Sequence, residues 1–159
     1  MAQIACVPSL ALLLPDLSAT EALAGRIAGL LQPGDAVLLE GPLGAGKSAL
    51  ARALLRTLLD DPALEVPSPS YTLVQLYDAP VGPVHHFDLW RLDGPAATAE
   101  LGWDDARDGV VLVEWPDRLG VLRPDDALTV TLSLAGGDVC HDRRRAVLTG
   151  WPGRLERLA

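Results

Sequence analysis

Residues 41–48 have the residue types and spacing that bind a chain of phosphates. Their sequence, GPLGAGKS, fits the pattern G-x-x-x-x-G-K-[ST] of a phosphate-binding loop. The glycines permit backbone conformations in which successive N–H groups surround a phosphate, while Lys47 meets the outer phosphates and Ser48 can ligate Mg²⁺. We therefore expect a nucleotide site formed by Gly41, Pro42, Leu43, Gly44, Ala45, Gly46, Lys47, Ser48 and Ala49.

Lys47 is the single lysine of a chain that otherwise uses twelve arginines as its cations. A glycine-rich turn that binds nothing is the alternative interpretation of the motif. However, a compact ammonium on a flexible stem suits a position between phosphates, which favours a functional loop. With no second lysine, the chain also lacks the [NT]-K-x-D element that many GTPases use to bind guanine, so the sequence favours ATP over GTP.

Two acidic residues stand where expected strands end. Asp88 closes the segment 84–88, and Glu114 closes the aliphatic segment 110–114 in the manner of a Walker B strand. Ligands of open α/β sheets bind beyond the carboxyl ends of the strands, and Mg²⁺ is usually held by one or two carboxylates together with phosphates and water. Solvated acids at strand ends are the alternative. The predicted metal ligands are Ser48, Asp88 and Glu114, and the predicted catalytic residues are Lys47, Asp88 and Glu114.

Three hydroxyl residues and a pair of histidines have both a functional and a structural interpretation. Ser68, Ser70 and Thr72 lie in a proline-stiffened loop at the position where many P-loop proteins sense the γ-phosphate, although hydroxyls that only satisfy the turn backbone are equally expected. His85 and His86 would point to opposite faces of a regular strand. They are therefore not expected to form a metal pair, and packing is the favoured interpretation of both.

Composition restricts the classes of protein to which this chain can belong. Its 159 residues suffice for one hydrophobic core, and its net charge of −8 disfavours direct binding to nucleic acid. Cys6 and Cys140 fit reduced thiols better than a disulfide framework or a zinc site. The apolar run 9–14 is too short to span a membrane, and no Lys or Arg precedes Arg26. We expect a cytoplasmic protein with no membrane association.

The sequence also predicts the strand and the helix that hold the two ends of the phosphate-binding loop. The sequence predicts a first strand over 9–14 and a helix that begins near Ser18, where Ser18 and Glu21 have capping-box spacing. A buried strand over 36–40 then enters the loop, and a helix leaves it over 48–59, ending before Asp60-Asp61-Pro62.

The second half of the chain predicts two hairpins, two short helices and a buried strand. The first hairpin consists of a stiff loop that leads into a strand over 66–77, a turn over 78–83 and a strand over 84–88. Short helices over 96–101 and 104–108 follow, and then the buried strand over 110–114. The second hairpin has strands over 127–134 and 143–149 around a turn at 136–138. The tail from Trp151 is left unassigned.

These elements together predict a single α/β domain of the P-loop NTPase type over residues 1–159. Its mixed sheet would have parallel core strands flanked by helices and by antiparallel hairpins. The motifs fall within residues 9–121, and residues 122–159 form the C-terminal hairpin and tail without a motif.

Several segments resemble, in order and spacing, the bacterial TsaE (YjeE) ATPases. The P-loop is shared with many proteins, but the sequences H-x-D-L-x-R-L and V-E-W-P at this separation are much more specific. The resemblance covers roughly residues 9–121. The matching segments are 41–48, 68–74, 86–92, 100–102 and 112–118.

The resemblance implies an ATPase needed for threonylcarbamoyladenosine modification at position 37 of tRNA. It implies that the protein acts on the TsaD–TsaB heterodimer, with tRNA involved only indirectly. The Mg²⁺-linked residues of the family fall on Ser48 and Asp88, and its Walker-B-like acid falls on Glu114 with Trp115 alongside. Thr72 falls within its switch-like loop and is therefore also expected to bind the nucleotide.

The departures from the family pattern are small. Threonine is common where Ser48 and Ser70 stand, an acid where Pro42 stands, and tyrosine where Trp90 stands. Serine keeps the hydroxyl that a metal needs, so the predicted chemistry is retained.

The favoured hypothesis is a Mg²⁺-dependent ATPase that is weak or inactive until partner proteins bind. A small-molecule P-loop kinase is one alternative, for which Arg91 or Arg118 would clamp the transferred phosphate. A non-hydrolytic module that signals by being loaded with nucleotide or empty is another.

Overall fold

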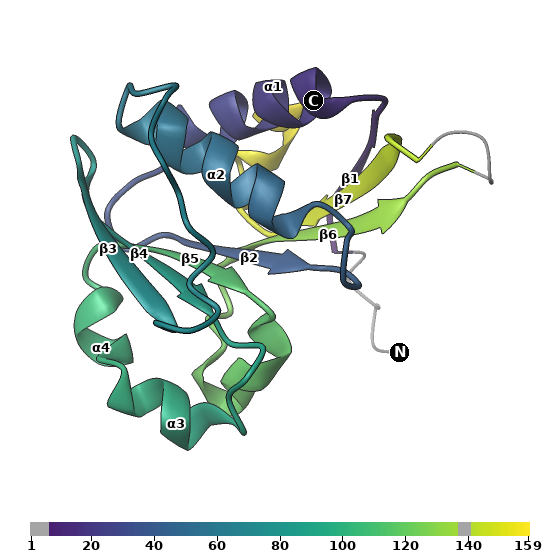
Figure 1. Ribbon diagram of the computed structural model, residues 1–159. Helices are drawn as coiled ribbons and strands as arrows, with labels where there is room; N and C mark the ends of the chain where they lie inside the picture. Colours follow the sequence, from purple (N-terminus) through teal and green to yellow (C-terminus); the bar gives the residue numbers. More distant parts are fainter. Residues whose placement is uncertain (1–6, 137–140) are drawn as a thin grey trace, which may run out of the picture.

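The computed structural model describes residues 7–136 and 141–159, and these form one seven-stranded sheet with helices on both faces (Figure 1). The strand order is β1-β7-β6-β2-β5-β4-β3. The strands are β1 (Ser9–Leu14), β2 (Ala36–Glu40), β3 (Val74–Ala79), β4 (Gly82–Asp88), β5 (Val110–Glu114), β6 (Leu128–Leu134) and β7 (Arg144–Thr149). The helices are α1 (Leu17–Ala28), α2 (Lys47–Leu58), α3 (Pro95–Glu100) and α4 (Trp103–Ala106), with 3₁₀ turns η1 (Pro116–Leu122) and η2 (Leu155–Leu158).

The middle of the sheet is parallel, as the sequence predicts. Strand β2 pairs in parallel with β5 on one side and with β6 on the other, and β4 pairs in parallel with β5. Both β2 and β5 are covered on both faces, which explains why residues 36–39 and 110–113 are continuously apolar. The predicted mixed sheet with a parallel core is confirmed.

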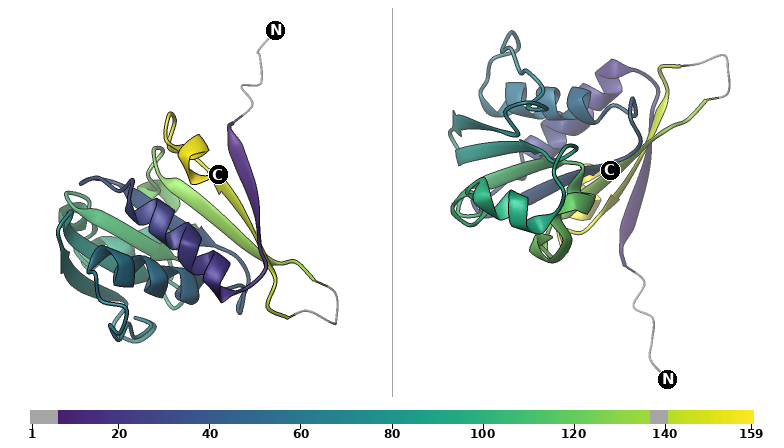
Figure 2. Two further views of the ribbon diagram at one scale, coloured as in Figure 1. Left: turned by 90° about the horizontal axis from the view of Figure 1, so that it is seen from above. Right: turned by 60° about the horizontal axis from the view of Figure 1, so that its bottom comes forward.

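Alternate residues of the central strands build two separate cores. Val37 and Leu39 of β2 pack toward α1 and α2, which lie side by side on one face (Figure 2). Ala36 and Leu38 pack on the other face, with Phe87 among their neighbours. Because the side chains alternate, every strand residue next to the P-loop has a defined face, and this fixes which strand-end groups can meet α2.

Antiparallel strands complete the sheet at both edges. The hairpin β3–β4 forms one edge, and β7 pairs with both β6 and β1 at the other. The first hairpin is tighter than the predicted turn over 78–83, because Asp78 pairs with Pro83 and Ala79 with Gly82, which leaves only two residues in the turn. Of the predicted second turn, residues 137 and 138 lie outside the described residues, as do Cys6 and Cys140.

Helix α1 begins one residue earlier than expected and has a different cap. The side chain of Asp16 accepts a hydrogen bond from the Ala19 N–H at 2.9 Å, so Asp16 is the N-cap. The predicted capping box of Ser18 and Glu21 is therefore wrong. Leu17 is already the first helical residue, which places Ser18 inside the helix rather than at its start.

The C-terminal tail, which the sequence left unassigned, packs against the rest of the fold. Trp151 is 1% exposed, and the following turn η2 lies near α1, where the Arg26 Nε donates to the Leu158 carbonyl at 3.1 Å. Arg154 donates to both carboxylate oxygens of Asp35, at 2.7 and 2.9 Å. Across residues 7–136 and 141–159, no helix combines the length and apolar character needed to cross a membrane.

Candidate nucleotide site

The P-loop connects β2 to α2 and has the backbone shape that its glycines predict. Gly41, Gly44 and Gly46 have φ values of +142°, +79° and +104°, which side chains disfavour. At Gly41 a Cβ atom would also lie 2.4 Å from the carbonyl oxygen of Leu132 on β6. The loop therefore rests directly on a neighbouring strand, and the N-terminus of α2 opens toward it with unpaired N–H groups and partial positive charge.

Lys47 is buried at the start of α2, with 5% of its surface exposed. Its ammonium donates to the carbonyls of Gly41 at 2.6 Å and Pro42 at 2.8 Å, and it lies 4.0 Å from the centre of the Trp115 ring. Burial lowers the pKa of Lys47, while the nearby carboxylates of Glu114 and Asp88 act in the opposite direction. The predicted phosphate-binding cation is thus held at the mouth of the loop.

Asp88 and Glu114 lie directly opposite each other at the ends of β4 and β5. They are 5% and 1% exposed. The hydroxyl of Ser48, in the first turn of α2, donates to Glu114 Oε1 at 2.7 Å. The structure therefore brings together Lys47, Ser48, Asp88 and Glu114, which the sequence predicts as one site although they come from three separate segments.

Asp88 is held by the loop that precedes β3. Ser70 Oγ donates to Asp88 Oδ2 at 3.1 Å, Ser68 Oγ approaches the same oxygen at 3.4 Å, and the Trp90 N–H donates to Oδ1 at 3.1 Å. Thr72 is different: it is exposed and accepts a hydrogen bond from Gln75 Nε2 at 3.0 Å. The structure places Thr72 outside the lining of the site cavity.

Two aromatic rings form the rim beside Lys47. Trp115 follows Glu114 with a left-handed backbone (φ +59°), and its ring packs against Trp90 with ring centres 4.2 Å apart. The sequence allowed Trp115 to be either a packing residue or a contact at the rim of the site. The structure places it at the rim. It also shows that Trp90, where the family pattern has tyrosine, remains an aromatic neighbour of the site.

Two residues of the site could not be identified from the sequence. His86, interpreted as a packed histidine, lies 2.8 Å from Glu114 Oε2 through its Nε2. Arg144, in the C-terminal hairpin without motifs, donates from Nε to the Ala45 carbonyl at 3.1 Å and so supports the P-loop from β7. The H-x-D spacing was a signal for His86, since alternate residues share a face with Asp88, but nothing local pointed to Arg144.

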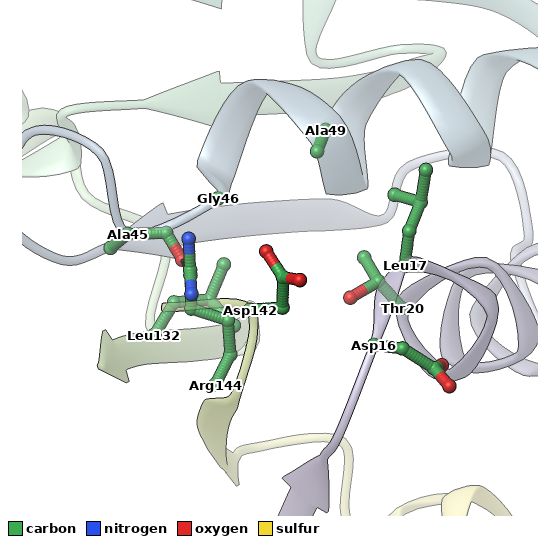
Figure 3. A pocket seen from close by; sticks show the side chains of 9 residues that line it. All are labelled: Asp16, Leu17, Thr20, Ala45, Gly46, Ala49, Leu132, Asp142 and Arg144. Carbon is green, nitrogen blue, oxygen red and sulfur yellow. Dashed lines mark hydrogen bonds between the residues drawn. The ribbon is translucent and has the colours of Figure 1, made fainter. Parts of the chain in front are cut away.

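Two adjoining cavities open along the N-terminus of α2. The first, of about 340 Å³, is lined by the predicted catalytic residues Lys47, Asp88 and Glu114. The second, of about 440 Å³, lies between the P-loop, α1 and β7, with Asp142 and Arg144 on one side and Leu17 and Thr20 on the other (Figure 3). Both cavities are lined by Gly46 and Ala49, so they adjoin at the N-terminus of α2. The residues lining the first are Leu43, Gly44, Gly46, Lys47, Ser48, Ala49, Ser68, Ser70, Asp88, Trp90, Glu114 and Trp115.

The oxygen donors in the first cavity fit a magnesium ion shared with a phosphate ligand. Within residues 7–136 and 141–159, no three His, Cys, Asp or Glu side chains form a metal cluster of their own. Ser48, Asp88 and Glu114 instead supply a hydroxyl and two carboxylates next to the phosphate loop. Mg²⁺ commonly keeps waters and takes only one or two protein carboxylates, so this donor set suits it.

The arginines that a kinase would need are not at this cavity. Arg91 lies over the ring of Tyr71, 4.4 Å from its centre, and Arg118 lies 3.7 Å from Asp117. Neither residue lines the cavity that holds Lys47. The two arginines that the kinase alternative named as clamps therefore lie outside the lining of this cavity.

Comparison with known protein families gives one consistent match. The family model described as "Threonylcarbamoyl adenosine biosynthesis protein TsaE" matches residues 14–145. A Rickettsia conorii protein named tRNA threonylcarbamoyladenosine biosynthesis protein TsaE is 35% identical over 114 residues, which are 71% of this chain but only 65% of that relative's length. The Bacillus subtilis protein of the same name is 32% identical over 141 residues, covering 87% of this chain and 84% of its own.

A solved structure agrees with the fold. The crystal structure of Bacillus subtilis YdiB superimposes with a TM-score of 0.76 at 28% sequence identity. The match covers 96% of this chain and 93% of that one. At this coverage the match includes most of residues 122–159, in which the sequence offered no motif.

Proposed function

Because this chain belongs to the TsaE family of tRNA threonylcarbamoyladenosine biosynthesis proteins, we propose that it is the Mg²⁺-dependent ATP-hydrolysing member of that machinery. One observation carries the proposal. The hydroxyl of Ser48 and the paired carboxylates of Asp88 and Glu114 meet beside Lys47 at the carboxyl ends of β2, β4 and β5. This is the edge of an α/β sheet at which ligands bind.

The loop N–H groups and four side chains of the first cavity have assigned roles in this proposal. The loop N–H groups and Lys47 bind the phosphates, and Ser48 with Asp88 holds the metal directly or through water. Glu114 is fixed by hydrogen bonds and orients the attacking water or the metal. Mg²⁺, when bound, neutralises charge on the phosphate oxygens.

The second cavity suits the nucleoside end of ATP. It adjoins the first cavity at Gly46 and Ala49, and in this proposal a nucleotide with its outer phosphates at Lys47 places its sugar and base between α1 and β7. The single lysine of the chain leaves no guanine-reading [NT]-K-x-D element, which supports ATP over GTP.

The TsaD–TsaB heterodimer is the partner in this proposal, and tRNA is engaged only through it. Exposed apolar side chains near the site support docking of a protein surface. Leu43 at the tip of the P-loop is 82% exposed, Tyr71 is 83% exposed and Trp90 is 48% exposed. Apolar groups exposed together in this way commonly mark an interaction surface.

Phosphate release tests the proposed activity. The purified chain is mixed with ATP and Mg²⁺, with and without the TsaD–TsaB heterodimer, and inorganic phosphate is measured. We expect hydrolysis that increases with the heterodimer and that falls about 100-fold in Lys47→Ala and in Glu114→Gln. Arg157→Ala, at an exposed position in the tail, is the matched control.

The products also discriminate the alternatives. Phosphate retained on a small-molecule acceptor would indicate a kinase, and tight ATP binding without turnover in the full mixture would indicate a non-hydrolytic module. Hydrolysis that survives in both Lys47→Ala and Glu114→Gln would contradict the assigned site.

A further inference from the structure

His86 lies in the buried core immediately behind the catalytic acids. It is on β4, two residues before Asp88, so the two side chains share the sheet face that is covered by α2. Its strand partner on β5 is Leu112, two residues before Glu114. This register places the imidazole beneath Glu114 and on the same side of the sheet as the first turn of α2.

The imidazole contacts Glu114 directly. His86 Nε2 and Glu114 Oε2 are 2.8 Å apart, and both side chains are almost completely buried, at 1% and 2% exposure. The other carboxylate oxygen, Oε1, accepts the hydrogen bond from Ser48. The Glu114 carboxylate is therefore hydrogen-bonded on both oxygens, by His86 from the core and by Ser48 from the P-loop helix.

The donors and acceptors around His86 indicate which imidazole nitrogen carries the proton. A carboxylate only accepts, so the nitrogen that faces Glu114 must donate. His86 Nδ1 has no hydrogen-bond partner among the described residues. An N–H at Nδ1 would thus be a buried donor without an acceptor, which is rarer and costlier than an unused lone pair. The contacts favour the Nε2–H tautomer.

We propose that His86 is a positioning residue that holds the Glu114 carboxylate in its working orientation. A glutamate side chain has several rotatable bonds, and the ammonium of Lys47 is close enough to attract this carboxylate. The bond from His86 opposes that rotation and leaves Oε1 directed at Ser48. The inference rests on the proposed function, because its kinetic consequence appears in ATP hydrolysis.

Three substitutions separate positioning from packing. His86→Gln keeps an amide N–H close to the original Nε2, His86→Asn places its amide nearer the original Nδ1 and too short to reach Glu114, and His86→Leu fills the core without a donor. We expect kcat for ATP to fall about 10- to 100-fold in His86→Asn and His86→Leu, with KM changed less than about threefold, and His86→Gln to recover most of kcat.

A merely structural histidine would give a different pattern. The activities would then follow the melting temperatures of the variants, and glutamine would not rescue a defect that leucine causes. Combining His86→Leu with Glu114→Gln adds a second test. Positioning predicts that the double variant is no slower than Glu114→Gln alone, whereas independent effects would multiply.

A measurement without turnover tests the contact itself. Long-range ¹H–¹⁵N spectra of the nucleotide-free chain distinguish the imidazole tautomers, and the His86 signals are assigned by their absence in His86→Gln. We expect the Nε2–H form with a protected proton, and loss of that protection in Glu114→Ala. An Nδ1–H form, or no response to Glu114→Ala, would overturn the inference. Absence of ATP turnover in the mixture of the unaltered chain with the TsaD–TsaB heterodimer would instead count against the proposed function, since the spectra report on the His86–Glu114 contact independently.

Discussion

Each oxygen of Glu114 has its own donor, and this shapes the residue-scale chemistry of the site. Ser48 and His86 occupy the two oxygens, while Lys47 supplies positive charge nearby. Asp88 is arranged in the same way, with a serine hydroxyl on one oxygen and a backbone N–H on the other. A site whose acids are already oriented needs less reorganisation when a ligand enters.

Substituting Ser48 tests whether its hydroxyl serves the metal. In Ser48→Ala we expect Mg²⁺-stimulated hydrolysis to fall at least tenfold, because a hydroxyl ligand is lost and Glu114 Oε1 loses its donor. Ser48→Thr keeps a hydroxyl and is the matched comparison. Phosphate release is measured across a magnesium titration, and equal magnesium dependence in the alanine variant and the unaltered chain would contradict the role.

His85 gives a prediction about stability rather than catalysis. It lies on the opposite face from His86, with its ring 6.2 Å from that of Phe87, and burial lowers its pKa. As pH falls below about 6.5, the ordinary histidine pKa, the unfolded chain takes up a proton that the folded chain resists. The resulting stability is therefore complete above that pH and is lost as pH falls toward the lowered pKa.

Denaturant unfolding at pH 7.5 and pH 5.5 measures this contribution. We expect the unaltered chain to lose more free energy of unfolding over that interval than His85→Gln does. The other two histidines are present in both proteins, so the difference isolates position 85. An identical pH dependence in the two proteins would show that burial of His85 has no such effect.

At the scale of elements, support for the site comes from parts of the chain that are distant in sequence. Arg144 reaches the P-loop from β7, and the carbonyl of Leu132 on β6 is the surface against which Gly41 packs. The tail after β7 in turn covers the end of α1. The C-terminal elements therefore hold the phosphate loop in place although they supply none of the acids.

The central strands and the site acids could be predicted from sequence because their signals are local. Continuous aliphatic residues predict 36–40 and 110–114, and a strand-end acid follows from the rule for ligand position in α/β sheets. The cap of α1 was missed because Asp16 and Ser18 are both good capping residues, and only the structure shows which one the backbone uses.

The remaining features depend on tertiary contacts that no local pattern specifies. Arg144 belongs to the run Arg143-Arg144-Arg145, which looks like a solvated charge cluster until β7 is placed beside the P-loop. The role of His86 likewise depends on the register that pairs Asp88 with Glu114. Both follow from strand order, which the sequence alone left undetermined.

The docking of the C-terminal tail gives an element-scale prediction. Arg154 makes two bonds to Asp35, a third to the Leu30 carbonyl at 2.9 Å, and packs over the Trp151 ring at 4.0 Å. Arg154→Ala leaves the mostly buried Asp35 carboxylate without this partner, so we expect the free energy of unfolding to fall by about 2 kcal/mol. Nucleotide affinity should change little.

Chemical denaturation and nucleotide titration check both parts of that expectation. The exposed Arg157→Ala is the control, and its effect on stability should stay within about 0.5 kcal/mol. A loss of nucleotide affinity in Arg154→Ala, at unchanged stability, would place the tail in the site instead.

At the scale of the whole molecule, the net charge and the side chains around the site both affect which kind of partner the protein can bind. The net charge is −8, and Lys47, the predicted phosphate-binding cation, is buried. The exposed apolar side chains near the cavity are suited to a protein surface and poorly suited to a polyanion. This balance is consistent with our proposal that the chain takes part in tRNA modification through a protein partner.

Direct tRNA binding is correspondingly expected to be negligible. With labelled tRNA at 0.15 M salt, we predict no saturable fluorescence anisotropy change below about 100 µM protein, because few phosphates can be neutralised. Adding the TsaD–TsaB heterodimer should produce binding that the chain alone does not. Tight, salt-sensitive binding by the isolated chain would contradict the prediction.

The parallel pairing of β2 with β5 and β6 also determines when the site can first exist during synthesis. The P-loop sequence leaves the ribosome early, but its acid partner Glu114 and the supporting Leu132 emerge only with the second half of the chain. Such long-range pairings form slowly, because distant segments must close before any contact stabilises them. A nascent chain that stops before β6 thus has the phosphate-binding motif without the site, and ATP binding should mark the moment at which the central sheet is complete.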